Sequence, residues 1–161
     1  MAEQQKSEFE EKVLAVDRVS RTVAGGRRMR FRALVVVGNR NGKVGMGIGK
    51  ANEVAIAIAK ANSQARKHLI SVPIVKETIP FNVEVSFSST HIQLKSARPG
   101  TSIIAGGVIR QVVALAGIKN IVAKIHGSTN QINSAKAVFA ALSKLVRLYG
   151  NGQTSETDKA A

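Results

Sequence analysis

The sequence contains no cysteine and few acids, with 10 Asp and Glu against 24 Lys and Arg. Without cysteine the chain can form no disulfide, no thiolate zinc site and no thiol nucleophile. Asp occurs only at positions 17 and 158, so no acidic cluster is present to hold a catalytic metal ion. His68, His91 and His126 lack the spacing of a metal site. We therefore expect a protein without a cofactor or metal, and not an enzyme.

The sequence also lacks tryptophan and long hydrophobic runs. No apolar stretch reaches transmembrane length, and no basic-then-apolar segment signals secretion, so we expect a cytoplasmic protein that binds no membrane. Only five Phe and one Tyr are present. Readers of single-stranded nucleic acid need exposed aromatic platforms, and Phe31, Phe81, Phe87 and Phe139 fall on predicted core faces. Recognition of folded RNA by shape and phosphate contacts is the mode that remains.

What the chain has is positive charge, with a formal net charge of +14. A hydrophobic content of 44% is still sufficient for a packed core. The charge is concentrated in residues 13–70, where twelve Lys and Arg face only Asp17 and Glu53. Such an imbalance favours nucleic acid as the partner.

The strongest single feature is an alternating basic strand over residues 27–37. Met29, Phe31 and Ala33 are predicted to face the core, which places a row of arginines on the opposite face with almost no acid nearby. A solvated strand face is the ordinary interpretation of a charge run, but the single sign of this one favours phosphate contact. The predicted RNA-binding residues are Arg18, Ser20, Arg21, Gly25, Gly26, Arg27, Arg28, Arg30, Arg32, Lys43, Gly47 and Lys50.

The first half of the chain is predicted to be a β-β-β-α domain over residues 13–72, after a disordered acidic tail over 1–12. Strands are expected at 13–20, 27–37 and 43–50, and Asn41-Gly42 is typical of a tight hairpin turn. A helix capped by Asn52 is expected to run to about Ile70, with apolar residues at helical spacing.

The second half is predicted to be a β-β-α-β-α domain over residues 81–149. A linker over 73–80 precedes it and a polar tail over 150–161 follows. Strands are expected at 81–87, 91–96 and 120–125. Helices are expected at about 101–116, ended by Gly117, and from the capping loop 127–130 to about 149. The fold class is therefore α+β, with two small domains.

Two glycine-rich segments suggest other roles. Gly45, Gly47 and Gly49 do not match a P-loop. Around Gly49-Lys50, that motif needs a glycine where Val44 stands and a serine or threonine where Ala51 stands. At a spacing of two they share one strand face, open either to a closely packed helix or to an RNA backbone. Residues 101–107 are predicted to open a helix, whose N-terminus could bind the phosphate of a small phosphotransferase substrate.

Four motifs, in order, make the chain resemble bacterial ribosomal small-subunit protein five: residues 44–51, 100–107, 115–124 and 127–133. The resemblance covers residues 10–149. It implies a first domain that is a variant of the double-stranded-RNA-binding fold. It also implies a second domain shared with translocation factors and some kinases, without kinase activity.

The resemblance further implies binding to small-subunit rRNA near the decoding region, along the mRNA entry path. It implies contacts with ribosomal small-subunit proteins four and eight, support of subunit assembly and decoding accuracy, and no small-molecule substrate. The partner-protein interface implied for this chain comprises Gly100, Thr101, Gly106, Gly107 and Arg110. A double-stranded-RNA-binding module acting outside the ribosome and a small phosphotransferase are the alternatives.

Overall fold

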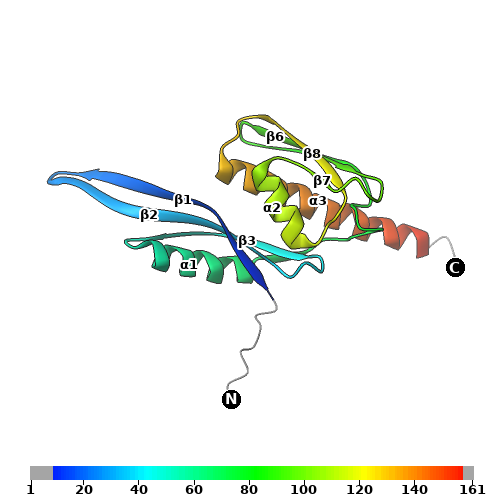
Figure 1. The fold of residues 1–161 in the computed structure, drawn as a ribbon, viewed down its shortest axis with the longest axis horizontal. Coiled ribbons are helices and arrows are strands. Elements are labelled where there is room, and N and C mark those ends of the chain that lie inside the picture. The colour runs from blue at the N-terminus through cyan, green and yellow to red at the C-terminus, as the bar shows by residue number, and fades with distance from the viewer. Residues whose placement is uncertain (1–8, 158–161) are drawn as a thin grey trace, which may run out of the picture.

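A computed structural model of the chain describes residues 9–157 as two four-stranded sheets and three helices. In the first sheet, β1 (Glu10–Val23), β2 (Gly26–Gly38), β3 (Lys43–Ala51) and β4 (Leu69–Ser71) lie in chain order, all antiparallel. Helix α1 (Val54–Lys67) covers one face of this sheet, and the other face packs on α2 (Gly107–Ala116) (Figure 1). The α+β class and the two-part organisation are as predicted.

The second sheet has the order β5-β6-β8-β7. Strands β5 (Val83–Phe87), β6 (Thr90–Ser96) and β8 (Ile121–Gly127) are antiparallel neighbours, and the short β7 (Ile103–Ile104) runs parallel to β8. Helices α2 and α3 (Gln131–Thr157) pack together against one face of this sheet (Figure 1). Asn130 caps α3, because its Oδ1 accepts the backbone N–H groups of Ile132 and Asn133 at 3.1 and 3.2 Å.

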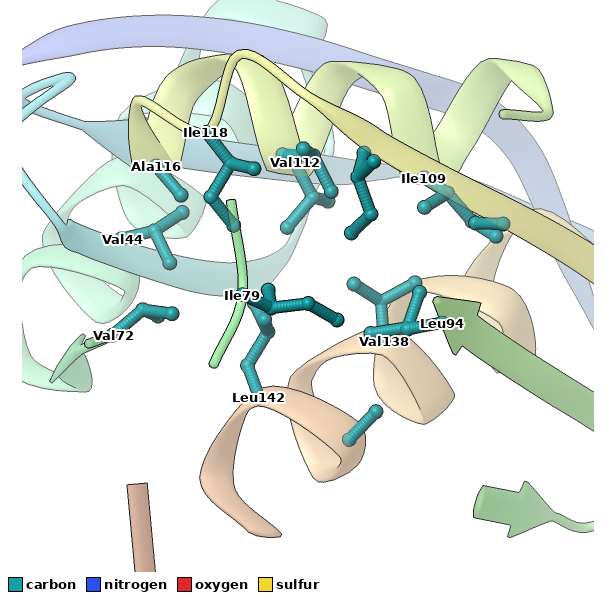
Figure 2. Close-up of a cluster of buried hydrophobic side chains, with 14 of the residues drawn as sticks. Val44, Val72, Ile79, Leu94, Ile109, Val112, Ala116, Ile118, Val138 and Leu142 are labelled. Carbon is teal, nitrogen blue, oxygen red and sulfur yellow. The ribbon is translucent and has the colours of Figure 1, made fainter. Parts of the chain in front are cut away.

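One hydrophobic cluster joins the two sheets. It takes Val36 and Val44 from the first sheet, Val112 from α2 and Leu142 from α3, all fully buried. Figure 2 shows Val44, Val112 and Leu142 facing one another in this cluster. Helix α2 is buried on both sides, as expected of a helix that is apolar nearly all round. The predicted linker over 73–80 is part of this core, since Ile79 within it is only 1% exposed.

Several predicted boundaries were wrong. Strand β1 begins at Glu10, so residues 10–12 are not a disordered tail, while residues 1–8 lie outside the described residues. Helix α3 continues to Thr157, so most of the predicted polar tail is helical, and residues 158–161 lie outside the described residues.

Two short strands were mistaken for helix. Helix α1 stops at Lys67, and the apolar residues that follow form β4, which pairs with β3. Helix α2 starts at Gly107 and not at 101, because Ile103 and Ile104 pair with β8 as β7. The cap of α1 is also different, since Glu53 occupies the N-cap position and no side chain caps the helix.

Candidate nucleic-acid interface

The β1–β2 hairpin extends beyond the body of the protein (Figure 1). Strand β3 pairs with β2 only from Phe31 onward, so the stretch from Gly26 to Arg30 has β1 as its sole strand neighbour. Every residue from Arg21 to Arg30 is exposed. The turn at Ala24-Gly25 is closed by Gly26, whose φ of +136° suits glycine. The hairpin is thus a free arm of two strands.

One face of this arm forms a concave surface, which we call the cationic concavity. It has a volume of about 500 Å³. The residues that line it are Val19, Ser20, Arg21, Val23, Arg28, Arg30 and Lys50. Four of the seven carry positive charge and none carries negative charge. Phosphate is the anion most suited to such a surface, because guanidinium groups bind it through paired N–H donors.

Strand register explains how these residues meet. Arg21 lies directly opposite Arg28 in the antiparallel pair, and Val19 lies opposite Arg30. Lys50 belongs to β3 and joins this group because it pairs with Arg32, which lies two residues after Arg30 on β2. None of Arg21, Arg28, Arg30 and Lys50 forms an ion pair with a residue between 9 and 157. Like charges opposite each other destabilise a strand pair, so this arrangement costs stability unless an anion binds there.

Arg32 differs from the other arginines in the row. Its Nη2 and Nε both donate to Oδ2 of Asp17, at 2.8 and 3.2 Å, across the β1–β2 pair. The expectation that almost no acid lies near the row was therefore wrong at this position. Arg32 is not among the residues that line the cationic concavity, and Asp17 already compensates its charge.

Other predicted RNA-binding residues lie apart from the cationic concavity. Arg18 pairs with Phe31 and Arg27 with Thr22, which places both on the opposite face of the hairpin. Lys43 is exposed but begins β3 at the far end of the sheet, opposite Ser71. Gly25 and Gly26 form the tip. Met29, predicted to be in the core, is 44% exposed.

Gly47 is not available to RNA. It is buried, and a Cβ placed on it would lie 2.0 Å from the carbonyl oxygen of Ala61 in α1. A Cβ on Gly45 would lie similarly close to the carbonyl oxygen of Ala65, and a Cβ on Gly49 to that of Ala57. The three glycines therefore let α1 approach the sheet closely, which was the structural alternative for this motif, and the RNA prediction for Gly47 was wrong.

The predicted partner-protein residues lie around the start of α2. Gly100 and Thr101 belong to the turn before β7, while Gly106 and Gly107 are the N-cap and first residue of the helix. Arg110 is exposed one turn later. Asn120, which no sequence pattern singled out, also belongs to this region and is only 4% exposed.

The side chain of Asn120 fixes the turn before β7. Its Oδ1 accepts the N–H groups of Gly100 and Ser102 at 3.1 and 3.0 Å. Ile103 and Ile104 in this segment form β7, so the segment is not the continuous helix start that was predicted. In the described part of the chain no group of three or more His, Asp or Glu could hold a metal ion. No helix there is long and apolar enough to cross a membrane.

Comparison with known proteins gives a family for both halves. Residues 9–73 match the N-terminal domain of ribosomal protein S5, and residues 85–149 match its C-terminal domain. The chain is 49% identical over 146 residues to small ribosomal subunit protein uS5 of Thermotoga neapolitana, covering 91% of this chain and 82% of the relative.

Two further relatives carry the same name. The protein of Thermus thermophilus is 49% identical over 140 residues, covering 87% and 86% of the two chains. That of Chloroflexus aurantiacus is 47% identical over 142 residues, covering 88% and 80%. The family is one of structural components of the ribosome and not of enzymes. With both domains matched in order, the chain belongs to the ribosomal protein S5 family.

Proposed function

We propose that this protein is a structural constituent of the cytoplasmic small ribosomal subunit and that it binds rRNA through the cationic concavity. The observation that carries the proposal is the cluster of Arg21, Arg28, Arg30 and Lys50 on a free arm, without a compensating acid. Each phosphate that such a surface neutralises releases condensed counterions, which favours binding.

Geometry supports folded RNA over an extended strand. The concavity offers cations and two valines, Val19 and Val23, but no aromatic ring on which a base could stack. Phosphate contacts of this kind set position and orientation and carry no sequence information. The hairpin would therefore act as a positioning arm that recognises the shape of an rRNA fold.

The body of the protein is proposed to contact other parts of the subunit. The turn of exposed Gly100 and half-buried Thr101, together with the exposed Arg110, is the proposed face for ribosomal small-subunit protein four, with protein eight and the mRNA entry path as further neighbours. Support of assembly and of decoding accuracy would follow from that placement. The support for these finer assignments is the family membership together with the exposure of these residues.

The test is the salt dependence of binding to a folded fragment of small-subunit rRNA. Replacing Arg28, Arg30 and Lys50 with Gln should lower the slope of log affinity against log salt by about 2 to 3, because each lost phosphate contact removes about 0.9. The control replaces Lys60, Lys95 and Arg147 with Gln. It has the same net charge as the hairpin variant, but the three charges are removed from exposed sites outside the hairpin. Equal slopes for the two variants would mean that net charge, and not the hairpin, determines binding.

A further inference from the structure

A second hollow lies away from the cationic concavity. This groove of about 570 Å³ runs between the start of β1 and the first turns of α2 and α3, at the opposite end of β1 from the hairpin turn. Its polar lining includes Lys12, Gln111, Lys124, Thr129 and Ser134, and no Asp or Glu between residues 9 and 157 lines it. The proposed function makes no use of it.

The N-terminus of α2 opens into this groove without a cap. The first bond of the helix runs from Arg110 N–H to the Gly106 carbonyl at 2.9 Å, so the N–H groups of Gly107 and Val108 have no acceptor within the helix. Gly106 supplies no side-chain cap. A Cβ placed on Gly107 would meet nothing within 4 Å, so the space above these donors is open.

Two lysines add charge to the same groove. Lys12 comes from β1 and Lys124 from β8, and neither makes an ion pair with a residue between 9 and 157. The acids beside Lys12 are already engaged, because Glu10 pairs with Arg40 and Glu11 pairs with Arg66. The local balance of the groove is therefore positive.

Ser134 is an independent indication of a ligand. It lies in the first turn of α3, lines the groove and is 0% exposed, yet its hydroxyl has no hydrogen-bond partner in the part of the chain that the structure describes. Leaving a buried hydroxyl without a partner is destabilising, so such groups are nearly always satisfied. An acceptor bound in the groove would satisfy this one.

We propose that this groove is a binding site for a phosphate group. The residues that line it come from several elements and carry different donors: backbone amides in α2, lysines in β1 and β8, and hydroxyl residues just before and within the first turn of α3. A tetrahedral anion with several acceptor oxygens matches that arrangement better than a planar carboxylate does. The phosphate is either a phosphodiester of RNA or a free phosphate, and only the RNA source rests on the proposed function.

The experiment titrates the full chain with inorganic phosphate at constant ionic strength and follows backbone amides by NMR. The resonances of Gly107 and Val108 should shift and saturate. Lys124→Gln should weaken binding about fivefold, as expected for one charged contact, and Gly107→Asp should abolish it. Lys95→Gln is the matched control, an exposed lysine on the neighbouring strand that does not line the groove, and should bind like the parent.

The outcomes separate the sources of the ligand. If an rRNA fragment shifts the same amides and phosphate displaces it, the phosphate is that of RNA. If the fragment shifts only hairpin amides, the groove takes free phosphate. Phosphate binding should persist when Arg28, Arg30 and Lys50 are replaced, which keeps this site distinct from the hairpin. Shifts that do not saturate, equal binding by the Lys124→Gln and Lys95→Gln variants, or response to an oligoglutamate peptide alone would overturn the proposal.

Discussion

At the scale of single residues, the glycines of β3 lie too close to backbone carbonyls of α1 for any side chain to fit. Gly47 lies under α1 with room for hydrogen only, and Gly49 and Gly45 repeat the contact along β3. The spacing of two was visible in the sequence, but the sequence did not say which surface approaches. Periodicity assigns residues to a face of a strand without naming what covers that face.

Replacing Gly47 with Ala should lower the free energy of unfolding by about 2 to 3 kcal/mol, since the added methyl forces α1 away from the sheet. Gly25→Ala is the control, because a Cβ there meets nothing within 4 Å. Urea denaturation of both variants measures the difference. Equal stability of the two would contradict the packing described for α1.

Glu10 and Arg40 form the ion pair with the clearest electrostatic signature. Nε and Nη2 of Arg40 donate to the two carboxylate oxygens of Glu10 at 2.7 and 3.1 Å. The hydrogen bond from Arg40 is the largest influence that holds the pKa of Glu10 below its ordinary value. Because the folded pKa is depressed, the stabilisation is present above the unfolded pKa and is lost as pH falls through the folded pKa.

Arg40→Gln should therefore raise the pKa of Glu10, as followed by carboxyl NMR titration. The stability difference between this variant and the parent should shrink as the solution is acidified through that range. Arg66→Gln, which removes the neighbouring ion pair with Glu11, should leave the pKa of Glu10 unchanged. An unchanged Glu10 pKa in the Arg40 variant would show that the pair does not form in solution.

At the scale of elements, the long strands and helices were predictable and the short ones were not. The alternation over 27–32 and the apolar spacing along α1 and α3 identify those elements directly. Leu69 continues the helical spacing of α1, so the sequence could not show that it belongs to β4. Strand β7 contains two residues and exists only because β8 lies beside it.

Helix caps give a direct test at this scale. Asn130→Ala should lower the free energy of unfolding by about 1 kcal/mol, because its Oδ1 holds two N–H groups of α3. Asn52→Ala should have little effect, since Asn52 is exposed and Glu53 is the N-cap of α1. Thermal and urea unfolding compare the two. A larger loss from the Asn52 variant would contradict the cap assignments.

At the scale of the whole molecule, the two halves share a core and are not joined by a free linker. The turn between β2 and β3 binds the end of α2, where Arg40 and Gly42 donate their N–H groups to the carbonyls of Leu115 and Ala116 at 2.9 and 2.8 Å. The unbroken apolar run from Ala33 to Val37 is the sequence signal for this arrangement. Such a run indicates a strand buried on both faces, and both faces here are covered.

Cooperative unfolding should follow from that shared core. Val112→Ala should cost about 2 kcal/mol through the cavity it leaves in α2. Native-state hydrogen exchange should then show equal loss of protection at Val36 in the first sheet and Leu94 in the second. Loss confined to Leu94 would mean that the halves unfold separately.

The candidate site was predictable in part. Arg21, Arg28, Arg30 and Lys50 were identified from charge and alternation, and the structure brings them together. Lys43 was included for its charge and Gly47 for the close approach that a glycine allows, but antiparallel pairing carries Lys43 to the other end of the sheet and α1 covers Gly47. The Asp17–Arg32 pair could not be found without the register of β1 against β2.

The measurement that tests the central claim most directly is sedimentation of tagged protein from cells through sucrose gradients at low and high salt. The parent and the Lys60, Lys95 and Arg147 to Gln control should migrate with the small subunit at both salt concentrations. The variant with Arg28, Arg30 and Lys50 replaced by Glu should remain largely at the top of the gradient, because charge reversal repels phosphate. Salt-resistant migration of that variant with the subunit would contradict the proposed role of the hairpin.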